Sequence, residues 1–210
     1  MEFLVQLFRA LANGNRIRIL RLLAVLGEMN VSDIARAADL QVNALSAHLR
    51  ILAAAGLVWR RRSGARVAYR LAESAGHPVT ARAVGTLTRV FRAIATTDPQ
   101  QVAAADQERS PTRSDAALFA CFTAFTHPRR LQIIRHLARR KTASLGELTA
   151  RLSMSLPACL RHLDKLERRG VIGRARPRKR GGYALRSGRG YVQKQLLSAV
   201  REHLVGESTG

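Results

Sequence analysis

Apolar residues follow a helical spacing through most of the 210-residue chain, in short segments separated by Gly, Pro and Asn. Apolar positions three and four residues apart fall on one face of a helix. In the first third of the chain this spacing predicts four helices, at 2–12, 15–26, 31–38 and 42–55. The stretches 57–62 and 66–71 then flank a turn at Ser63 and Gly64, which predicts two short strands joined as a β-hairpin.

The same pattern occurs a second time, 114 positions further along the chain. Residues 8–71 align with residues 122–185 without a gap, and many of the paired residues are identical. Identical pairs include Phe8/Phe122, Arg16/Arg130, Ile19/Ile133, His48/His162, Leu49/Leu163, Leu52/Leu166, Gly56/Gly170 and Tyr69/Tyr183. The alignment predicts matching helices at 115–126, 128–140, 145–152 and 156–169, followed by a second hairpin. One domain is therefore used twice.

Three or four helices followed by one hairpin is the layout of a winged helix-turn-helix. The predicted fold class is mainly α with small β-hairpin wings, arranged as two tandem winged helix-turn-helix domains. We expect domain 1 at residues 1–97 and domain 2 at residues 114–210, with a linker containing a short helix at 98–113. Each domain ends in a helix with an apolar face; these helices are predicted at 80–95 and 191–204.

The charge of the chain is strongly positive, with 36 basic and 14 acidic side chains and a formal net charge of +22. Such an excess favours a polyanionic partner, and nucleic acid also gains from counterion release. A membrane surface usually requires a basic amphipathic segment with aromatic residues, which we do not find. The longest uncharged apolar run, 51–59, is too short to span a bilayer. The preference for Arg over Lys suits phosphate and guanine recognition, although GC-rich codon usage explains it equally well.

Helix 42–55 has two chemically different faces. Its apolar stripe, which we expect in the core, consists of Val42, Leu45, Leu49 and Leu52. The opposite face and the residue before the helix are small, polar or basic: Gln41, Asn43, Ser46, Ala47, Arg50 and Ala54. Such a face permits close approach to base edges in the major groove, where Asn and Arg form bidentate contacts. A solvated helix face is the alternative.

The equivalent helix 156–169 carries a different set of polar residues. Its predicted DNA contacts are Ser155, Arg161 and Lys165. The aligned changes from the first copy are Asn43 to Pro157, Ala47 to Arg161, Arg50 to Asp164 and Ala54 to Arg168. Asp164 is unfavourable beside phosphate unless it pairs with an Arg or accepts from a cytosine amino group. We expect the two helices to read different half-sites, or one of them to act mainly as an electrostatic clamp.

Both predicted hairpins are densely basic. The first carries Arg60, Arg61, Arg62 and Arg66, and the second carries Arg174, Arg176, Arg178, Lys179 and Arg180. A run of charge is usually a solvated surface. Two such runs, each directly after a candidate recognition helix, are better explained by contacts with DNA phosphates.

Two segments of the first copy resemble the arsenical-resistance-repressor (ArsR) family of winged-helix regulators. Residues 7–12 followed by 16–20 resemble the opening of that family, and residues 46–52 running into 55–58 are very similar to its recognition-helix signature. The second copy keeps Arg161-His162-Leu163 but has Leu160 where the first copy has Ser46. The resemblance covers most of the chain when both copies are counted.

The resemblance implies a homodimeric repressor that pairs through its first and last helices and releases DNA upon metal binding or thiol oxidation. The Cys-x-Cys of metal-sensing members would fall at Asn30 and Ser32, and neither residue can supply a thiolate. The terminal helices also lack the spaced Asp and His ligands of the other common sensor site. Metal sensing is therefore disfavoured, no cofactor is expected, and the effector stays open. Because two heads lie in one chain, both a pseudo-dimeric monomer and a homodimer are consistent with the sequence.

Cysteine and histidine usage adds little chemistry. Cys121 and Cys159 fall on apolar helix stripes and are expected to be buried, with a redox switch as the less favoured alternative. His48 and His162 are expected to be packed structural residues rather than metal ligands or pH sensors. The start of the chain lacks the features of a signal peptide, so a cytoplasmic protein is expected.

The sequence therefore predicts a transcriptional regulator, a repressor by resemblance, whose partner is double-stranded DNA. The alternative is a non-specific architectural protein of the nucleoid, or an RNA-binding protein, held mainly by charge. No catalytic residues are proposed, because the chain has no phosphate-binding Gly loop, no zinc-spaced set and no recognisable carboxylate pair.

Overall fold

The computed structural model describes residues 1–210 except 65, 73–75, 98–112, 176–181, 189 and 207–210. The predicted linker and its short helix therefore lie outside the described residues, apart from Arg113. The chain divides into two units: a first unit of residues 6–119, and a second unit of residues 1–5 and 120–210. Both divisions fall within the first helix of a repeat.

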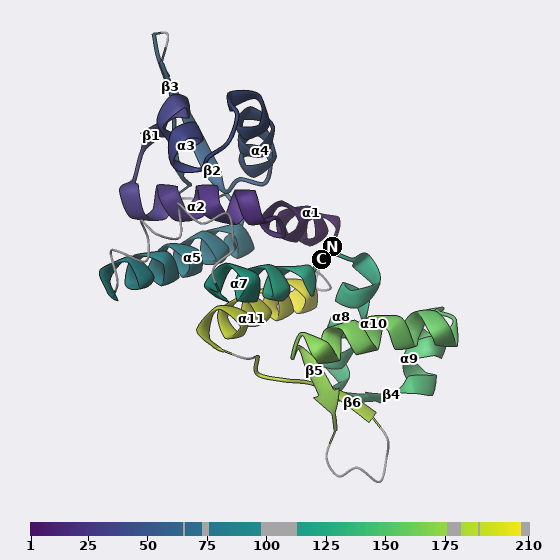
Figure 1. Ribbon diagram of the computed structural model, residues 1–210. Helices are drawn as coiled ribbons and strands as arrows, with labels where there is room; N and C mark the ends of the chain where they lie inside the picture. Colours follow the sequence, from purple (N-terminus) through teal and green to yellow (C-terminus); the bar gives the residue numbers. More distant parts are fainter. Residues whose placement is uncertain (65, 73–75, 98–112, 176–181, 189, 207–210) are drawn as a thin grey trace. The chain divides into compact units, whose positions relative to one another are not determined.

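The first repeat forms four helices and a small sheet before its terminal helix (Figure 1). The helices are α1 (Glu2–Leu11), α2 (Gly14–Leu26), α3 (Val31–Ala37), α4 (Val42–Ala54) and α5 (Pro78–Thr97). The strands are β1 (Met29–Asn30), β2 (Val58–Ser63) and β3 (Arg66–Leu71), in the antiparallel order β1-β3-β2. The β2–β3 hairpin extends beyond the helices as the wing (Figure 1).

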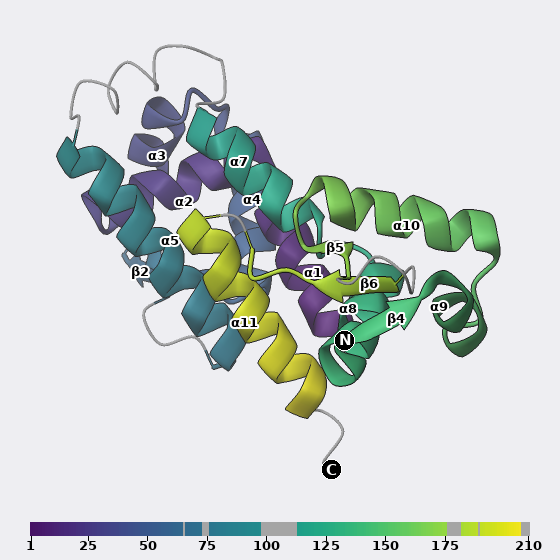
Figure 2. The same cartoon turned by 90° about the horizontal axis from the view of Figure 1, so that it is seen from below.

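The second repeat follows the same order (Figure 2). Its helices are α7 (Arg113–Thr123), α8 (Pro128–Arg140), α9 (Leu145–Arg151), α10 (Leu156–Arg168) and α11 (Gly190–Gly206). Its strands are β4 (Thr142–Ser144), β5 (Ile172–Arg174) and β6 (Gly182–Leu185), in the antiparallel order β4-β6-β5. The predicted fold class is confirmed: the chain is mainly α, with small winged sheets in two tandem winged helix-turn-helix regions.

Two details of the local prediction needed correction. A third strand in each sheet, β1 or β4, was not predicted, because two or three residues are too few to show a period. Val42 was expected in the core but is 52% exposed, as is Leu156 at 53% in the second repeat. Each opens its helix, before the turn where Leu45 or Cys159 begins the buried face.

Helix ends follow the chemistry of the residues placed there. The Asn13 side chain accepts a hydrogen bond from the Arg16 backbone NH at 3.1 Å, which caps α2. Gly56 and Gly170 follow α4 and α10 with φ of +68° and +71°, a left-handed conformation that glycine adopts without strain. Each recognition helix therefore ends at the same aligned position and turns into its wing.

A pair of aligned arginines fixes the end of each repeat's first helix. Arg16 donates to the carbonyls of Arg9 and Ala10. Arg130, 5% exposed, donates to the carbonyls of Thr123 and Ala124 at 2.8 Å each. A guanidinium suits this position, because carbonyls at a helix C-terminus carry partial negative charge and lack intrahelical donors.

A buried ion pair lies in the first unit. Arg21 of α2 and Asp115 of α7 lie 3.3 Å apart, with side chains only 7% and 8% exposed. Arg21 belongs to the first repeat and Asp115 to the second, so the first unit includes part of the second repeat's first helix. The aligned counterpart of Asp115 is Met1, which leaves no second carboxylate at the equivalent position.

Candidate nucleic-acid interface

The turn between the two helices of each helix-turn-helix is built the same way in both repeats. Asp39 and Ser153 occupy aligned positions in the turn, and both have φ of +48°. An arginine of α2 or α8, at positions that do not align between the repeats, holds a carbonyl of each turn at 3.0 Å: Arg18 donates to Ala38, and Arg129 donates to Leu152. The angle at which α4 and α10 leave their turns is thus fixed by backbone geometry and by a charged hydrogen bond.

Helix α4 packs through one face and leaves the other open. Leu45, Leu49 and Leu52 are at most 1% exposed. The residues predicted to contact DNA are all exposed: Gln41, Asn43, Ser46, Ala47 and Arg50. Gln41 occupies the N-cap position without making a side-chain capping bond. The exposed face of α4 is therefore small and polar at its N-terminal end, with Arg50 one turn beyond.

Helix α10 has the same burial pattern and a different surface. Cys159, Leu163 and Leu166 are at most 1% exposed, whereas the predicted contacts Ser155, Arg161 and Lys165 are exposed. Leu156 and Leu160, 53% and 42% exposed, place apolar side chains in the first turns of the helix. Leu160 stands where the first repeat has Ser46, and helical periodicity alone places it on the exposed face of α10.

Asp164 has the arginine partner that its position required. Its Oδ1 accepts a hydrogen bond from the Arg168 Nε at 2.9 Å, one turn along α10, and both side chains are more than half exposed. The pair neutralises the carboxylate that stands where α4 has Arg50. The Asp164–Arg168 pair therefore adds no net charge to α10, whose exposed cations also include Arg161 and Lys165.

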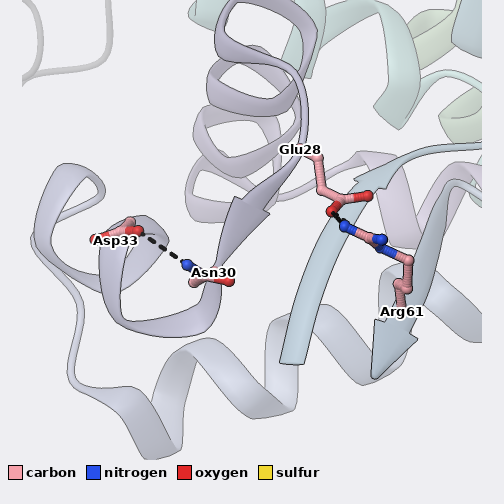
Figure 3. A network of polar contacts seen from close by, with 4 residues as sticks. All are labelled: Glu28, Asn30, Asp33 and Arg61. Carbon is pink, nitrogen blue, oxygen red and sulfur yellow. Dashed lines mark hydrogen bonds and ion pairs between the residues drawn. The ribbon is translucent and has the colours of Figure 1, made fainter. Parts of the chain in front are cut away.

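The first wing has two faces with different partners. Cross-strand pairing sets Arg60 opposite Tyr69 and Arg62 opposite Val67, so these two arginines lie on one face of the hairpin. Arg61 lies on the other face and forms an ion pair with Glu28, at the end of the loop before β1 (Figure 3). All four predicted wing residues, including Arg66, are exposed. Arg60 and Arg62 therefore lie on the face of the hairpin that does not carry the Arg61–Glu28 ion pair.

The second wing is described only at its base. Arg174 is exposed, and its guanidinium lies 4.5 Å from the centre of the Tyr183 ring. The predicted contacts Arg176, Arg178, Lys179 and Arg180 lie outside the described residues. Their position within the wing stays a sequence-based prediction.

A family model described as a helix-turn-helix domain matches residues 11–60 of the chain and again residues 125–172. The arsenical resistance operon repressor of Escherichia coli is 42% identical over 73 residues, covering 34% of this chain and 62% of the repressor. The regulator Rv0324 of Mycobacterium tuberculosis is 48% identical over 64 residues, covering 30% of this chain and 28% of that protein. The chain thus spans less than two thirds of either relative.

Two solved structures from Mycobacterium bovis are also similar in sequence. One, a possible transcriptional regulatory protein (fragment 1–100), is 34% identical; the match covers 46% of this chain and 90% of that one, with a TM-score of 0.35. The other is a homodimeric winged helix-turn-helix DNA-binding domain (fragment 1–100) of a possible ArsR-family transcriptional regulator. It is 31% identical; the match covers 52% of this chain and 87% of that chain, also with a TM-score of 0.35. The chain belongs to the ArsR family of winged helix-turn-helix proteins. In it the domain is present twice, as the two family-model matches require.

The ArsR-family positions associated with metal sensing hold other chemistry here. Asn30 Nδ2 donates to the Asp33 carboxylate at 3.5 Å at the start of α3 (Figure 3). Among the described residues, no group of three or more His, Cys, Asp or Glu side chains could hold a metal ion. Within the same residues no helix has the length and apolar character needed to cross a membrane.

Cys121 and Cys159 are buried, as predicted, whereas His48 and His162 are half-buried. The rings of His127 and His162 lie 4.5 Å apart, and burial, together with the positive charge of His127 and nearby arginines, lowers the pKa of His162 to about 4. Burial also lowers the pKa of His48. It raises the pKa of Cys121 to about 12 and raises that of Cys159. Neither thiol is therefore poised as a thiolate near neutral pH.

Proposed function

We propose that this chain is a sequence-specific, double-stranded-DNA-binding transcriptional regulator that acts as a repressor. Helices α4 and α10 read the major groove, and the wings contact the backbone or the minor groove. The observation that carries the proposal is the first head: the exposed polar face of α4 precedes a wing on which Arg60, Arg61, Arg62 and Arg66 are exposed. A net charge of +22 supplies the attraction to the phosphates. The named repressor among the relatives supports repression.

Fluorescence anisotropy tests this function directly. The full chain is titrated against the DNA upstream of its own gene and against a scrambled duplex of the same length, over a series of salt concentrations. A preference of roughly a thousandfold or more is expected for the upstream DNA. Near-equal affinity for both duplexes, falling steeply with salt, would instead support the architectural alternative.

Arg50 is the base-reading residue of the first head in this proposal. Replacing Arg50 by alanine is expected to cost about 1–3 kcal/mol on the preferred site and to relax sequence preference at one position, because Arg forms bidentate contacts with guanine. Arg201→Ala on α11 is the control, since it removes the same charge from an exposed site on a helix that is neither a recognition helix nor part of a wing. An equal loss from Arg50→Ala on every sequence would assign Arg50 to phosphate rather than to a base.

The second head reads thymine in this proposal. Leu156 and Leu160 give α10 an exposed apolar start, and an apolar side chain in the major groove recognises the thymine 5-methyl group. Deoxyuridine in place of thymine within the half-site bound by α10 is expected to weaken binding about fourfold for each contacted methyl group. In the variant Leu160→Ser, which restores the residue of the first repeat, the deoxyuridine substitution at that contact is expected to have no effect. An unchanged deoxyuridine effect in Leu160→Ser would remove Leu160 from the contact.

We further propose that one chain supplies both heads of a pseudo-dimer, paired through the first and last helices of the domains. The buried contact between Arg21 of α2 and Asp115 of α7, the first helix of the second repeat, supports an association of the two repeats within one chain, because it joins residues of both within one unit. Sedimentation of the protein–DNA complex distinguishes one bound chain per site from two.

A further inference from the structure

A cavity of about 630 Å³ lies in the second unit, between the start of α8 and one side of α10. These two helices pack against each other (Figure 1). The lining comes from α8 with its N-cap and from α10 with its C-cap, and consists of His127, Arg130, Arg161, His162, Asp164, Lys165, Arg168 and Arg169. Neither Leu156 nor Leu160 is among these residues, so the cavity is separate from the apolar start of α10.

The lining carries five cations and one carboxylate. The carboxylate, on Asp164, is already paired with Arg168. Arg130 donates to two carbonyls and a hydroxyl, which are neutral acceptors and leave its charge uncompensated. The other three cations form no ion pair with any residue that the structure describes. The cavity therefore favours an anion.

Like charges are crowded around this cavity. Burial and the positive charge of Arg169 together lower the pKa of Arg130. The low pKa of His162, in the same lining, has the same two kinds of cause, burial and neighbouring positive charge. Cations held close together without a counterion repel each other, and a bound anion removes that repulsion.

The cations are specific to the second repeat. The residues aligned with Arg161, Lys165, Arg168 and Arg169 are Ala47, Ile51, Ala54 and Ala55, all uncharged. The first repeat forms the same helix, followed by the same left-handed glycine, with these uncharged residues. The winged fold therefore does not depend on the four cations, and they mark a difference between the two heads.

The uncompensated cations of α10 form a row rather than a point. Arg161, Lys165 and Arg169 are spaced by four residues, which places them on one side of the helix. At a rise of 1.5 Å per residue, the row is about 12 Å long. A row of this length suits an extended polyanion with successive charges, such as a nucleic acid strand, better than a single small anion.

We propose that this cavity holds neighbouring backbone phosphates of one DNA strand, along the side of α10 that faces α8. Lys165 and Arg161 meet the phosphates at the exposed rim, and Arg169 meets them from the half-buried end of the row. The second head thus holds DNA partly through a contact that carries no sequence information. The inference rests on the proposed function in one respect, that the partner is duplex DNA.

A scrambled duplex tests the site without relying on sequence preference. The double variant Lys165→Gln, Arg169→Gln removes two cations of the row, and Arg140→Gln, Arg201→Gln is the control of equal net charge. Arg140 lies at the opposite end of α8 from the cavity, and Arg201 lies on α11. By anisotropy with the full chain, the row variant is expected to bind about fivefold or more weakly than the control. Equal affinity overturns the proposal, whether or not the wild type prefers its upstream DNA.

Neutral methylphosphonate linkages locate the contact on the preferred duplex. Replacing phosphates one at a time is expected to weaken wild-type binding about threefold or more at two or more neighbouring positions beside the half-site bound by α10. The row variant is expected to show no further loss at those positions, whereas the Arg140, Arg201 control keeps the wild-type profile. A wild-type profile in the row variant overturns the proposal. The preference of the wild type for upstream over scrambled DNA reports separately on the proposed function.

A free phosphate compound is the other source of the same chemistry. Inorganic pyrophosphate, added at constant ionic strength, is expected to displace DNA equally from the wild type and from the row variant. Displacement from the wild type alone would assign the cavity to a free phosphorylated compound and overturn the DNA assignment. Should circular dichroism show that the row variant does not fold, Lys165→Gln decides against Arg140→Gln, because Lys165 is exposed. Equal affinity of these two single variants for scrambled DNA overturns the site.

Discussion

Replacing Asp115 by alanine is expected to lower the free energy of unfolding by about 3–5 kcal/mol, because it removes the carboxylate from a guanidinium that remains buried. The Asp115 and Arg21 side chains are 8% and 7% exposed, so water cannot readily take over the lost interaction. Thermal unfolding followed by circular dichroism measures the effect. For a chain of this size the loss corresponds to a fall in Tm of about 10 °C.

Two comparisons test whether the pairing causes the loss. Asp164→Ala breaks an ion pair whose side chains are 78% and 54% exposed, and its expected cost is at most about 1 kcal/mol. The double variant Arg21→Met, Asp115→Leu replaces both charges by apolar groups and is expected to recover most of the stability. A cost for Asp115→Ala no larger than that for Asp164→Ala would show that the pair contributes little.

The local structure of this protein was predictable because its helices are short and amphipathic. Apolar residues spaced three and four apart predicted every described helix of the first repeat. The gapless alignment of the two repeats then predicted the matching helices of the second. The open face of α4 followed from the same spacing. Val42 was misplaced because periodicity assigns a face but does not say where along a helix the packing begins.

Contacts between residues far apart in sequence could not be predicted in this way. The strands β1 and β4 are defined by pairing with β3 and β6, not by any period of their own. Arg60, Arg61 and Arg62 form one charged run in the sequence. In the structure Arg61 differs from its two neighbours, because it pairs with Glu28 on the opposite face of the hairpin.

Neutralising Arg60 and Arg62 is expected to produce the largest change in salt dependence. The double variant Arg60→Gln, Arg62→Gln removes two exposed cations from the face of the hairpin that does not contact Glu28. Each lost phosphate contact reduces the slope of log K against log salt by about 0.9. Between 50 and 200 mM salt, the wild type is therefore expected to lose roughly tenfold more affinity than the variant, on specific and scrambled DNA alike. Anisotropy titrations at four or more salt concentrations measure both slopes.

The matched control has the same net charge as that variant but loses its two arginines from helices outside the wing. Arg140→Gln, Arg201→Gln removes two exposed arginines from α8 and α11, neither of which is a recognition helix or a wing. Because condensed counterions are released only where a cation meets a phosphate, this control is expected to keep the wild-type slope. A slope reduced equally in both double variants would show that net charge, rather than the wing, governs the interaction. A slope unchanged in both would place the first wing away from the DNA backbone, while the base-reading role of α4 would remain to be judged by Arg50→Ala.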